Sequence, residues 1–361
     1  MSYAQDCCSP EVCAPQVDAL LVTSPPAVSA LDAQRLAAVC YPEFRDCTLL
    51  AGERDVNFRI AANDGRALTL KFINSAEGLQ ETAMQVAVLK HLDGGTGVAA
   101  PHHEPAVLQE AAGGHQVTPG AWEDGQTLDW VLYRSVPEAT PVRVRAYGFL
   151  EGRPGAQLKA SPDGFASLGK SAAMLGLRLA DFDHPAAHRK LLWDTSQVLG
   201  LRSMLGAVSD ADELRMIEQY LARFEKNVAP ALAGLPHQVI HNDLSPSNIL
   251  VGDGRLSLVG ILDFGDMVYA PRIAEIAIAA SYQMDRCGDP SGVLVAMVGG
   301  YESVAPLSAD ERAHVLDLVL ARLVQRMVIT SWRAARFPSN RDYILRSHAA
   351  ATALFVRLHK G

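Results

Sequence analysis

The segment VIHNDLSPSNILV at residues 239–251, followed by LVGILDFGD at residues 258–266, decides the fold class of this chain. Both segments are rich in apolar and β-branched residues, and the segment between them begins with the turn sequence GDGR, so together they predict a β-hairpin. Three polar side chains flank its strands: Asp243, Asn248 and Asp263. Because a hairpin returns its second strand to the start of the first, we expect these side chains to lie close together.

The residue types at these positions suit phosphoryl transfer. The carboxylate of Asp243 can approach an acceptor hydroxyl from a loop and take its proton, while Asn248 and Asp263 offer the hard oxygen ligands that Mg²⁺ prefers. The order His-x-Asp-x-x-x-x-Asn and then Asp-Phe-Gly is typical of kinases, and it makes His241 a second candidate catalytic residue. The alternative interpretation is a polar loop beside a buried hairpin, in which His241 only braces the loop.

A candidate nucleotide-binding lysine lies in the N-terminal part of the chain. Lys71 stands in the apolar strand segment LTLKFI at residues 68–73, from which its ammonium can reach the α- and β-phosphates of a nucleotide. A helix follows, and its Glu81 is the candidate partner of Lys71, with Glu77 as a competitor. The alternative for Glu81 is a solvated helix face.

Two further segments are candidates for contacts with the nucleotide. The segment GERDVNF at residues 52–58 joins the first two strands and holds only one glycine. Its backbone amides, together with Arg54 or Asn57, would therefore have to hold the phosphates. Tyr147 begins the segment at residues 147–151, whose backbone groups we expect near the nucleotide base.

Hydrophobic periodicity predicts an α+β fold with a small antiparallel-sheet lobe followed by a larger, mainly helical lobe. We divide the chain into a leader or irregular arm (1–29), an N-terminal nucleotide-binding lobe (30–150) and a C-terminal catalytic and substrate-binding lobe (151–361). The expected strands lie at residues 47–50, 56–61, 67–73, 115–118 and 142–146. The expected helices begin at residues 30, 79, 165, 214, 273 and 315, and the helix that begins at 273 is expected to extend to 284.

The composition excludes several classes of protein. A chain of 361 residues exceeds the size at which a single core stops growing, and its 40 acidic against 32 basic residues give a net charge of −8, which argues against a nucleic-acid partner. No basic leader with an apolar stretch and no long apolar run occurs, so we expect a cytoplasmic protein without a membrane partner.

Three clustered cysteines, Cys7, Cys8 and Cys13, are either metal ligands or reduced thiols on a loose tail. The oligomeric state, including a homodimer, stays open.

With these motifs in order, the chain resembles the aminoglycoside phosphotransferase and choline kinase superfamily from about Ala30 to His359. These are small-molecule kinases with a protein-kinase-like fold, and within them the chain is most similar to the hydroxylysine kinase branch. The segments that carry the branch resemblance include DVNF at 55–58, LWD at 192–194, GILDFGDM at 260–267 and PSN at 338–340. The resemblance implies that Lys71 binds nucleotide phosphates, Asp243 is the catalytic base, and Asn248 and Asp263 hold Mg²⁺, with ATP or GTP as the donor.

The chain departs from protein kinases in ways that bear on the acceptor. Asn242 replaces the usual arginine, and no Ala-Pro-Glu segment follows Asp-Phe-Gly, so a peptide platform is missing and a small hydroxylated acceptor is favoured. We expect an amino alcohol or a hydroxy amino acid, with hydroxylysine favoured by the resemblance. Homoserine, choline or ethanolamine, and aminoglycosides are alternatives, as is a catalytically silent nucleotide-binding regulator.

Four residues are candidates for holding such an acceptor. Asp266 and Asp194 could supply counter-charge to an amino group, although both also suit ordinary loop or capping functions. Arg322 and Arg326, four residues apart on one helix, could hold a carboxylate, or could form salt bridges unrelated to substrate.

Overall fold

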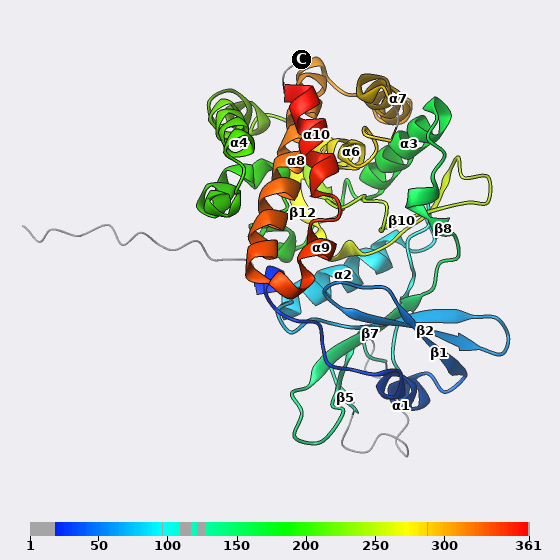
Figure 1. The fold of residues 1–361 in the computed structure, drawn as a ribbon. Helices are drawn as coiled ribbons and strands as arrows, with labels where there is room; N and C mark the ends of the chain where they lie inside the picture. The colour runs from blue at the N-terminus through cyan, green and yellow to red at the C-terminus, as the bar shows by residue number, and fades with distance from the viewer. Residues whose placement is uncertain (1–18, 96, 109–116, 121–126, 287, 360–361) are drawn as a thin grey trace, which may run out of the picture.

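The computed structural model describes residues 19–361 except 96, 109–116, 121–126, 287 and 360–361, and it has two lobes (Figure 1). The described strands of the small lobe form one antiparallel sheet, while the large lobe is mainly helical. The α+β fold expected from the sequence is therefore confirmed, and the division at residue 150 stays a proposal.

The sheet of the small lobe has the strand order β1-β2-β3-β7-β6-β5, and β4 also pairs with β7. Its strands are β1 (Phe44–Leu50), β2 (Val56–Ala62), β3 (Ala67–Phe72), β4 (His103–Glu104), β5 (Val117–Pro119), β6 (Val131–Tyr133) and β7 (Val142–Gly148). Gly65 has a φ of 90° in the turn between β2 and β3, a left-handed conformation that glycine adopts without strain. Phe72 lies edge to face with Phe58 and Tyr133, at centroid distances of 5.7 and 5.9 Å. All three rings belong to the hydrophobic core of this lobe.

Two helices accompany the sheet. Helix α1 (Ala30–Cys40) begins with a capping box in which Ser29 and Asp32 exchange hydrogen bonds. Helix α2 (Leu79–Leu92) lies between the sheet and the large lobe, and its buried Met84 and Leu89 belong to the core of the large lobe (Figure 1). The base of the small lobe is therefore packed onto the large one.

The large lobe combines helices with a short hairpin. The bounds of the helices are α3 (Pro162–Arg178), α4 (Ala211–Arg223), α5 (Ala229–Leu232), α6 (Ile273–Ser281), α7 (Pro290–Glu302), α8 (Ala309–Arg336), α9 (Arg341–Ile344) and α10 (His348–His359). Helix α8 has 28 residues and starts with a capping box between Ser308 and Glu311. Helices α3 and α7 cross closely, because a Cβ on Gly169 or Gly300 would collide with the backbone of the other helix.

The hairpin predicted from the motif is present. It consists of the antiparallel strands β10 (Ile249–Val251) and β11 (Leu258–Ile261), and β8 (Arg153–Pro154) pairs with the free edge of β10. Immediately before it, β9 (His237–Ile240) pairs with β12 (Val268–Pro271). The segment 241–248 is thus fixed between two small sheets.

Some expectations differ from the structure. The strand expected at 115–118 is β5, which begins at Val117, while residues 115 and 116 lie outside the described part. The helix expected over 273–284 ends at Ser281. Strands β4 and β6 were not predicted, because two or three residues are too few to show a periodicity of two.

Two expectations from composition concern the termini and the membrane. Cys7, Cys8 and Cys13 lie outside the described residues, whereas Cys40 and Cys47 are free thiols. Burial raises the pKa of Cys40 to about 12, so this thiol stays protonated. Among the described helices, none combines the length and the apolar character needed to cross a bilayer.

Candidate active site

The loop between β9 and β10 brings Asp243 and Asn248 together. The Nδ2 of Asn248 donates to the Oδ2 of Asp243 at 2.7 Å and to its backbone oxygen at 3.1 Å. Asn242 has a φ of 66°, and this left-handed residue turns the chain immediately before Asp243. The amide of Asn248 therefore orients the carboxylate that the sequence assigns to proton transfer.

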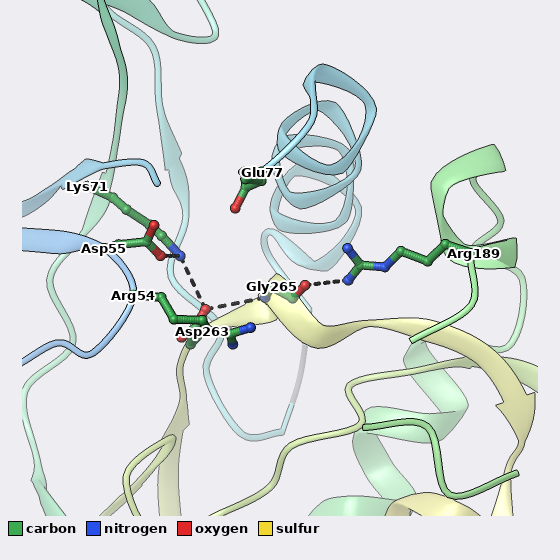
Figure 2. A pocket seen from close by; sticks show the side chains of 7 residues that line it. All are labelled: Arg54, Asp55, Lys71, Glu77, Arg189, Asp263 and Gly265. Atoms are coloured by element: carbon green, nitrogen blue, oxygen red, sulfur yellow. Dashed lines mark hydrogen bonds and ion pairs between the residues drawn. The ribbon is translucent and has the colours of Figure 1, made fainter. Parts of the chain in front are cut away.

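Lys71 connects the sheet of the small lobe to the hairpin of the large one. Its Nζ lies 3.3 Å from Oδ1 of Asp263 and 2.8 Å from Oδ2 of Asp55 (Figure 2). Burial acts to lower the pKa of Lys71, but the carboxylates of Asp263 and Asp55 outweigh it and raise that pKa, so the ammonium stays charged. The same ammonium holds the pKa of Asp263 well below its usual range.

These residues line one cavity of about 550 Å³ between the lobes, a volume in the range of small-molecule sites. Its walls include the predicted Asn57, Lys71, Tyr147, Asp243, Asn248 and Asp263. Helix α9 adds Tyr343, and the turn that follows it adds Arg346, whose guanidinium lies 3.9 Å from the Tyr343 ring centroid. Neither residue was among the site residues predicted from the sequence, although the PSN segment just before them was part of the resemblance.

Asp266 pairs with an arginine of the small lobe. Arg54 donates from its two terminal nitrogens to the two carboxylate oxygens of Asp266, at 2.9 and 3.0 Å. Burial acts to raise the pKa of Asp266, but the guanidinium of Arg54 outweighs it and holds that pKa below its usual value. The charge of Asp266 is thus balanced by Arg54, and the sequence did not indicate this pair.

His241 is fully buried and holds the loop in place. Its Nε2 lies 2.9 Å from the backbone oxygen of Leu262, and its Nδ1 lies 3.2 Å from the backbone nitrogen of Asp243. An imidazole protonated on Nε2 satisfies both contacts, since it donates to Leu262 and accepts from Asp243. Both ring nitrogens are therefore engaged with backbone groups, which supports the bracing alternative, while the catalytic assignment of His241 stays a prediction.

The structure does not bring Glu81 to Lys71. Glu81 lies in the first turn of α2, and its carboxylate is 3.9 Å from Arg189. Glu77 accepts a hydrogen bond from Thr82 at 2.6 Å and shares a small cavity with Lys71 (Figure 2). The direct carboxylate partners of Lys71 are Asp55 and Asp263, because the loop after β1 brings Asp55 closer than the helix brings Glu81.

Arg322 and Arg326 are both buried in helix α8. Arg322 donates to Oδ1 of Asp243 at 2.9 Å and to the backbone oxygen of Trp193 at 2.8 Å, and its guanidinium lies 4.7 Å from the Trp193 ring centroid. Arg326 donates to the backbone oxygen of Ser281 at 2.9 Å. Arg322 therefore contacts the candidate base itself. None of these contacts supports the expectation that the two arginines hold a carboxylate of the substrate.

Asp194 acts as a helix cap. Its two carboxylate oxygens accept from the backbone nitrogen and the hydroxyl of Ser196, both at 2.8 Å, at the start of the 3₁₀ segment η5 (Thr195–Ala207). Burial raises the pKa of Asp194. These contacts match the capping alternative, so the structure does not place Asp194 as a counter-charge for an acceptor.

The oxygens of Asn248 and Asp263 suit a divalent cation. Within the described part of the chain, no hydrogen-bond donor contacts Oδ1 of Asn248 or Oδ2 of Asp263, and both residues line the same cavity. An amide oxygen and a carboxylate oxygen are the hard ligands that Mg²⁺ prefers. The donor set thus fits the metal implied by the resemblance.

The arrangement of these residues agrees with the comparisons with known proteins. A profile of the phosphotransferase enzyme family, APH, matches residues 46–307, which is more than half of the chain. The chain belongs to the phosphotransferase enzyme family. Among curated proteins, the chain is similar to the hydroxylysine kinase of Mus musculus, which is 33% identical over 213 residues that cover 56% of this chain and 57% of the relative.

A second kind of relative carries a different substrate in its name. The homoserine kinase of Mesorhizobium japonicum is 33% identical over 198 residues, or 50% of this chain and 58% of the relative. The chain therefore spans a little over half the length of these relatives.

Solved structures share the kinase-like fold. An aminopropanol kinase associated with a microcompartment has a TM-score of 0.65 at 18% identity, over 91% of this chain and 97% of the other. The GDP complex of an aminoglycoside 2′-phosphotransferase has a TM-score of 0.62 at 15% identity, over 92% and 100%. At such identities the likeness establishes the fold.

Proposed function

We propose that the chain is a small-molecule kinase that transfers the γ-phosphoryl group of a nucleoside triphosphate to a hydroxyl group. One observation carries the proposal: Lys71 of the small lobe lines the same cavity between the lobes as Asp243, Asn248 and Asp263 of the large lobe. Their types match the three tasks of such an enzyme, which are phosphate binding, proton acceptance and metal binding.

The proposed reaction is an in-line displacement. The acceptor oxygen forms a bond to the γ-phosphorus, the bond from that phosphorus to the β,γ-bridging oxygen breaks, and the nucleoside diphosphate leaves. Asp243 orients the hydroxyl and receives its proton, and Lys71 binds phosphate oxygens of the donor. When bound by Asn248 and Asp263, Mg²⁺ would offset the negative charge of the phosphates. Because the transition state is loose, positioning and charge compensation supply most of the catalysis.

We assign 5-hydroxylysine as the favoured acceptor. The mammalian relative is named a hydroxylysine kinase, and the branch segments in the sequence support the same choice. Homoserine is the second candidate, supported by the bacterial relative named for it. Both acceptors are hydroxy amino acids, so the substrate class is the same for either.

The donor is ATP or GTP. Tyr147 and the segment 149–152 also line the cavity, as a base-binding connection between the lobes requires. Chain segments of this kind contact the base through backbone groups, so their side chains do not select between adenine and guanine.

An assay of Mg²⁺-dependent nucleotide consumption tests the proposal. We expect consumption of ATP or GTP with 5-hydroxylysine or homoserine as acceptor, and none with lysine, which lacks the hydroxyl. A screen that also includes choline, ethanolamine and an aminoglycoside covers the alternative acceptors. Bound nucleotide without consumption for any acceptor would instead indicate a silent nucleotide-binding regulator.

A further inference from the structure

The loop between β1 and β2 reaches across the cleft with charged side chains. Glu53 forms an ion pair with Arg333 of helix α8, Arg54 with Asp266, and Asp55 with Lys71. The first and second of these pairs join the two lobes. Arg54 and Asp55 of this loop therefore lie beside Lys71 and Asp263, where we propose that the phosphates bind (Figure 2).

The backbone of this loop is tightly curled. A Cβ on Gly52 would lie 2.7 Å from the backbone oxygen of Asp55, so a side chain at this position would disrupt the curl. Asn74 holds the other side, since its side chain donates to the backbone oxygen of Arg54 at 2.9 Å and its backbone nitrogen donates to Asp55 at 2.7 Å. These contacts fix two neighbouring side chains of opposite charge in the cleft.

From this geometry we propose that Arg54 is a phosphate-binding residue, which exchanges Asp266 for the terminal phosphate of the donor. The proposal rests on the proposed kinase function and identifies the residue that compensates for the glycine-poor loop. A guanidinium presents a planar fork that matches a phosphate as well as a carboxylate. The exchange therefore keeps two charge-assisted hydrogen bonds on Arg54.

The position of Arg54 favours this assignment over that of other cations. Arg54 and Lys71 line both the large cavity and the small cavity beside Asp263, whereas Arg346 lines only the large one and Arg189 only the small one. Arg346 stacks on Tyr343, and Arg189 donates to the backbone oxygen of Gly265 at 2.5 Å. Arg54 is also 27% exposed in its side chain, while Asp266 is 7% exposed, so the guanidinium is the accessible member of its pair.

We expect a parallel exchange at Lys71, whose partner is Asp55, the residue next to Arg54. Asp55 holds the ammonium of Lys71, which the proposed function assigns to the phosphates. The loop thus pairs Arg54 with a carboxylate near the candidate metal ligand Asp263, and Asp55 with the phosphate-binding lysine. Binding of a triphosphate would replace the carboxylates of Asp266 and Asp55, as partners of Arg54 and Lys71, with phosphate oxygens that also carry negative charge.

The test compares triphosphate with diphosphate binding, without an acceptor. Isothermal titration calorimetry in Mg²⁺ measures the dissociation constants of the β,γ-imido triphosphate analogue and of the diphosphate of the same base. We expect R54A to lower the preference for the triphosphate about tenfold or more, because a charge-assisted contact to the terminal phosphate is lost. R54K should lose less, since it keeps the charge without the fork.

The control variant is R333A. It releases Glu53 and loosens the attachment of the same loop, yet leaves Arg54 in place, so the triphosphate preference should stay at the wild-type value. If R54A weakens both nucleotides equally, or neither, the proposal is overturned and Arg54 only fastens the lobes. If R54A does not fold, D266N decides: freeing Arg54 should strengthen the triphosphate preference, and a weaker preference contradicts the proposal. A wild-type protein that binds no nucleotide would instead contradict the proposed kinase function.

Discussion

The carboxylate of Asp243 accepts a hydrogen bond from the buried guanidinium of Arg322 at 2.9 Å. Burial raises the pKa of Asp243, and the charge of Arg322 opposes that shift. One oxygen of Asp243 is thus held by Arg322 and the other by Asn248. This geometry makes Arg322 a positioning residue for the candidate base.

We expect Arg322→Met to lower turnover at pH 7 by about tenfold or more, because the candidate base loses both its orientation and its counter-charge. Without the guanidinium, burial acts unopposed by Arg322 and the pKa of Asp243 rises further. The acid limb of the pH profile of kcat/KM should therefore move to higher pH. Measuring kcat/KM from pH 5 to 9 for the wild type and the variant checks this.

Arg326→Met is the matched control for that experiment. Arg326 lies one helical turn along α8 and is also buried, but it donates to a backbone oxygen and not to Asp243. Its removal should move the acid limb much less than the loss of Arg322 does, because Arg326 acts on Asp243 through its charge and not through a hydrogen bond. An acid limb that moves equally in both variants would show that helix packing, and not the contact with Asp243, controls the titration.

Asp243→Asn should remove nearly all turnover while leaving nucleotide binding intact. A positioned general base contributes about 10²–10⁴-fold, and an amide cannot accept the proton. Turnover is measured with the acceptor identified in the consumption assay, and nucleotide affinity by calorimetry. A purified, folded variant with near wild-type turnover would contradict the assignment of Asp243.

Local sequence patterns predicted the part of the candidate site that lies in the large lobe. Asp243, Asn248 and Asp263 belong to a single hairpin motif, so their spacing along the chain is enough to predict their convergence. The short strands and turns around them also follow local rules of alternation and turn composition. The hairpin β10–β11 was predicted for this reason.

The ion pairs that complete the site had no such signal. Arg322 and Asp243 are 79 positions apart, and Arg54 and Asp266 are 212 positions apart. The contact of Arg54 with Asp266 depends on how the two lobes pack, and the contact of Arg322 with Asp243 depends on how α8 packs within the large lobe. No periodicity in the sequence records either. Arg322 was selected as a binder of substrate carboxylate from its helical spacing with Arg326, and only the packing of α8 against the loop reveals its contact with Asp243.

His241→Ala should slow turnover without altering the shape of the pH profile. The imidazole connects the backbone oxygen of Leu262 to the backbone nitrogen of Asp243, so its loss loosens the loop that carries the base. We also expect a loss of about 2 kcal/mol in the free energy of unfolding, since buried backbone groups lose their partners. His241→Gln, which keeps an acceptor and a donor, should recover part of both. If the variant loses a titration from the pH profile, His241 takes part in proton transfer after all.

The buried pair of Arg54 and Asp266 should make stability depend on pH in the acid range. Because the pKa of Asp266 is lower in the folded protein than in the unfolded chain, where it is about 3.9, the ionised carboxylate stabilises the fold above that pH. This contribution is lost as the pH falls through the lower, folded pKa. Asp266→Asn should therefore reduce the free energy of unfolding by about 3 kcal/mol at pH 7, and the deficit should shrink below about pH 4.

Urea unfolding of the wild type and Asp266→Asn between pH 3 and 8 measures this deficit. The pair of Arg202 and Glu225 supplies a control of the same bidentate geometry, at 2.8 and 2.7 Å, on an exposed surface. Solvent screens such a pair, so Glu225→Gln should change stability far less at every pH. A deficit in Asp266→Asn that grows as the pH falls would mean that the pKa of Asp266 is raised in the folded protein, and that burial outweighs the guanidinium of Arg54.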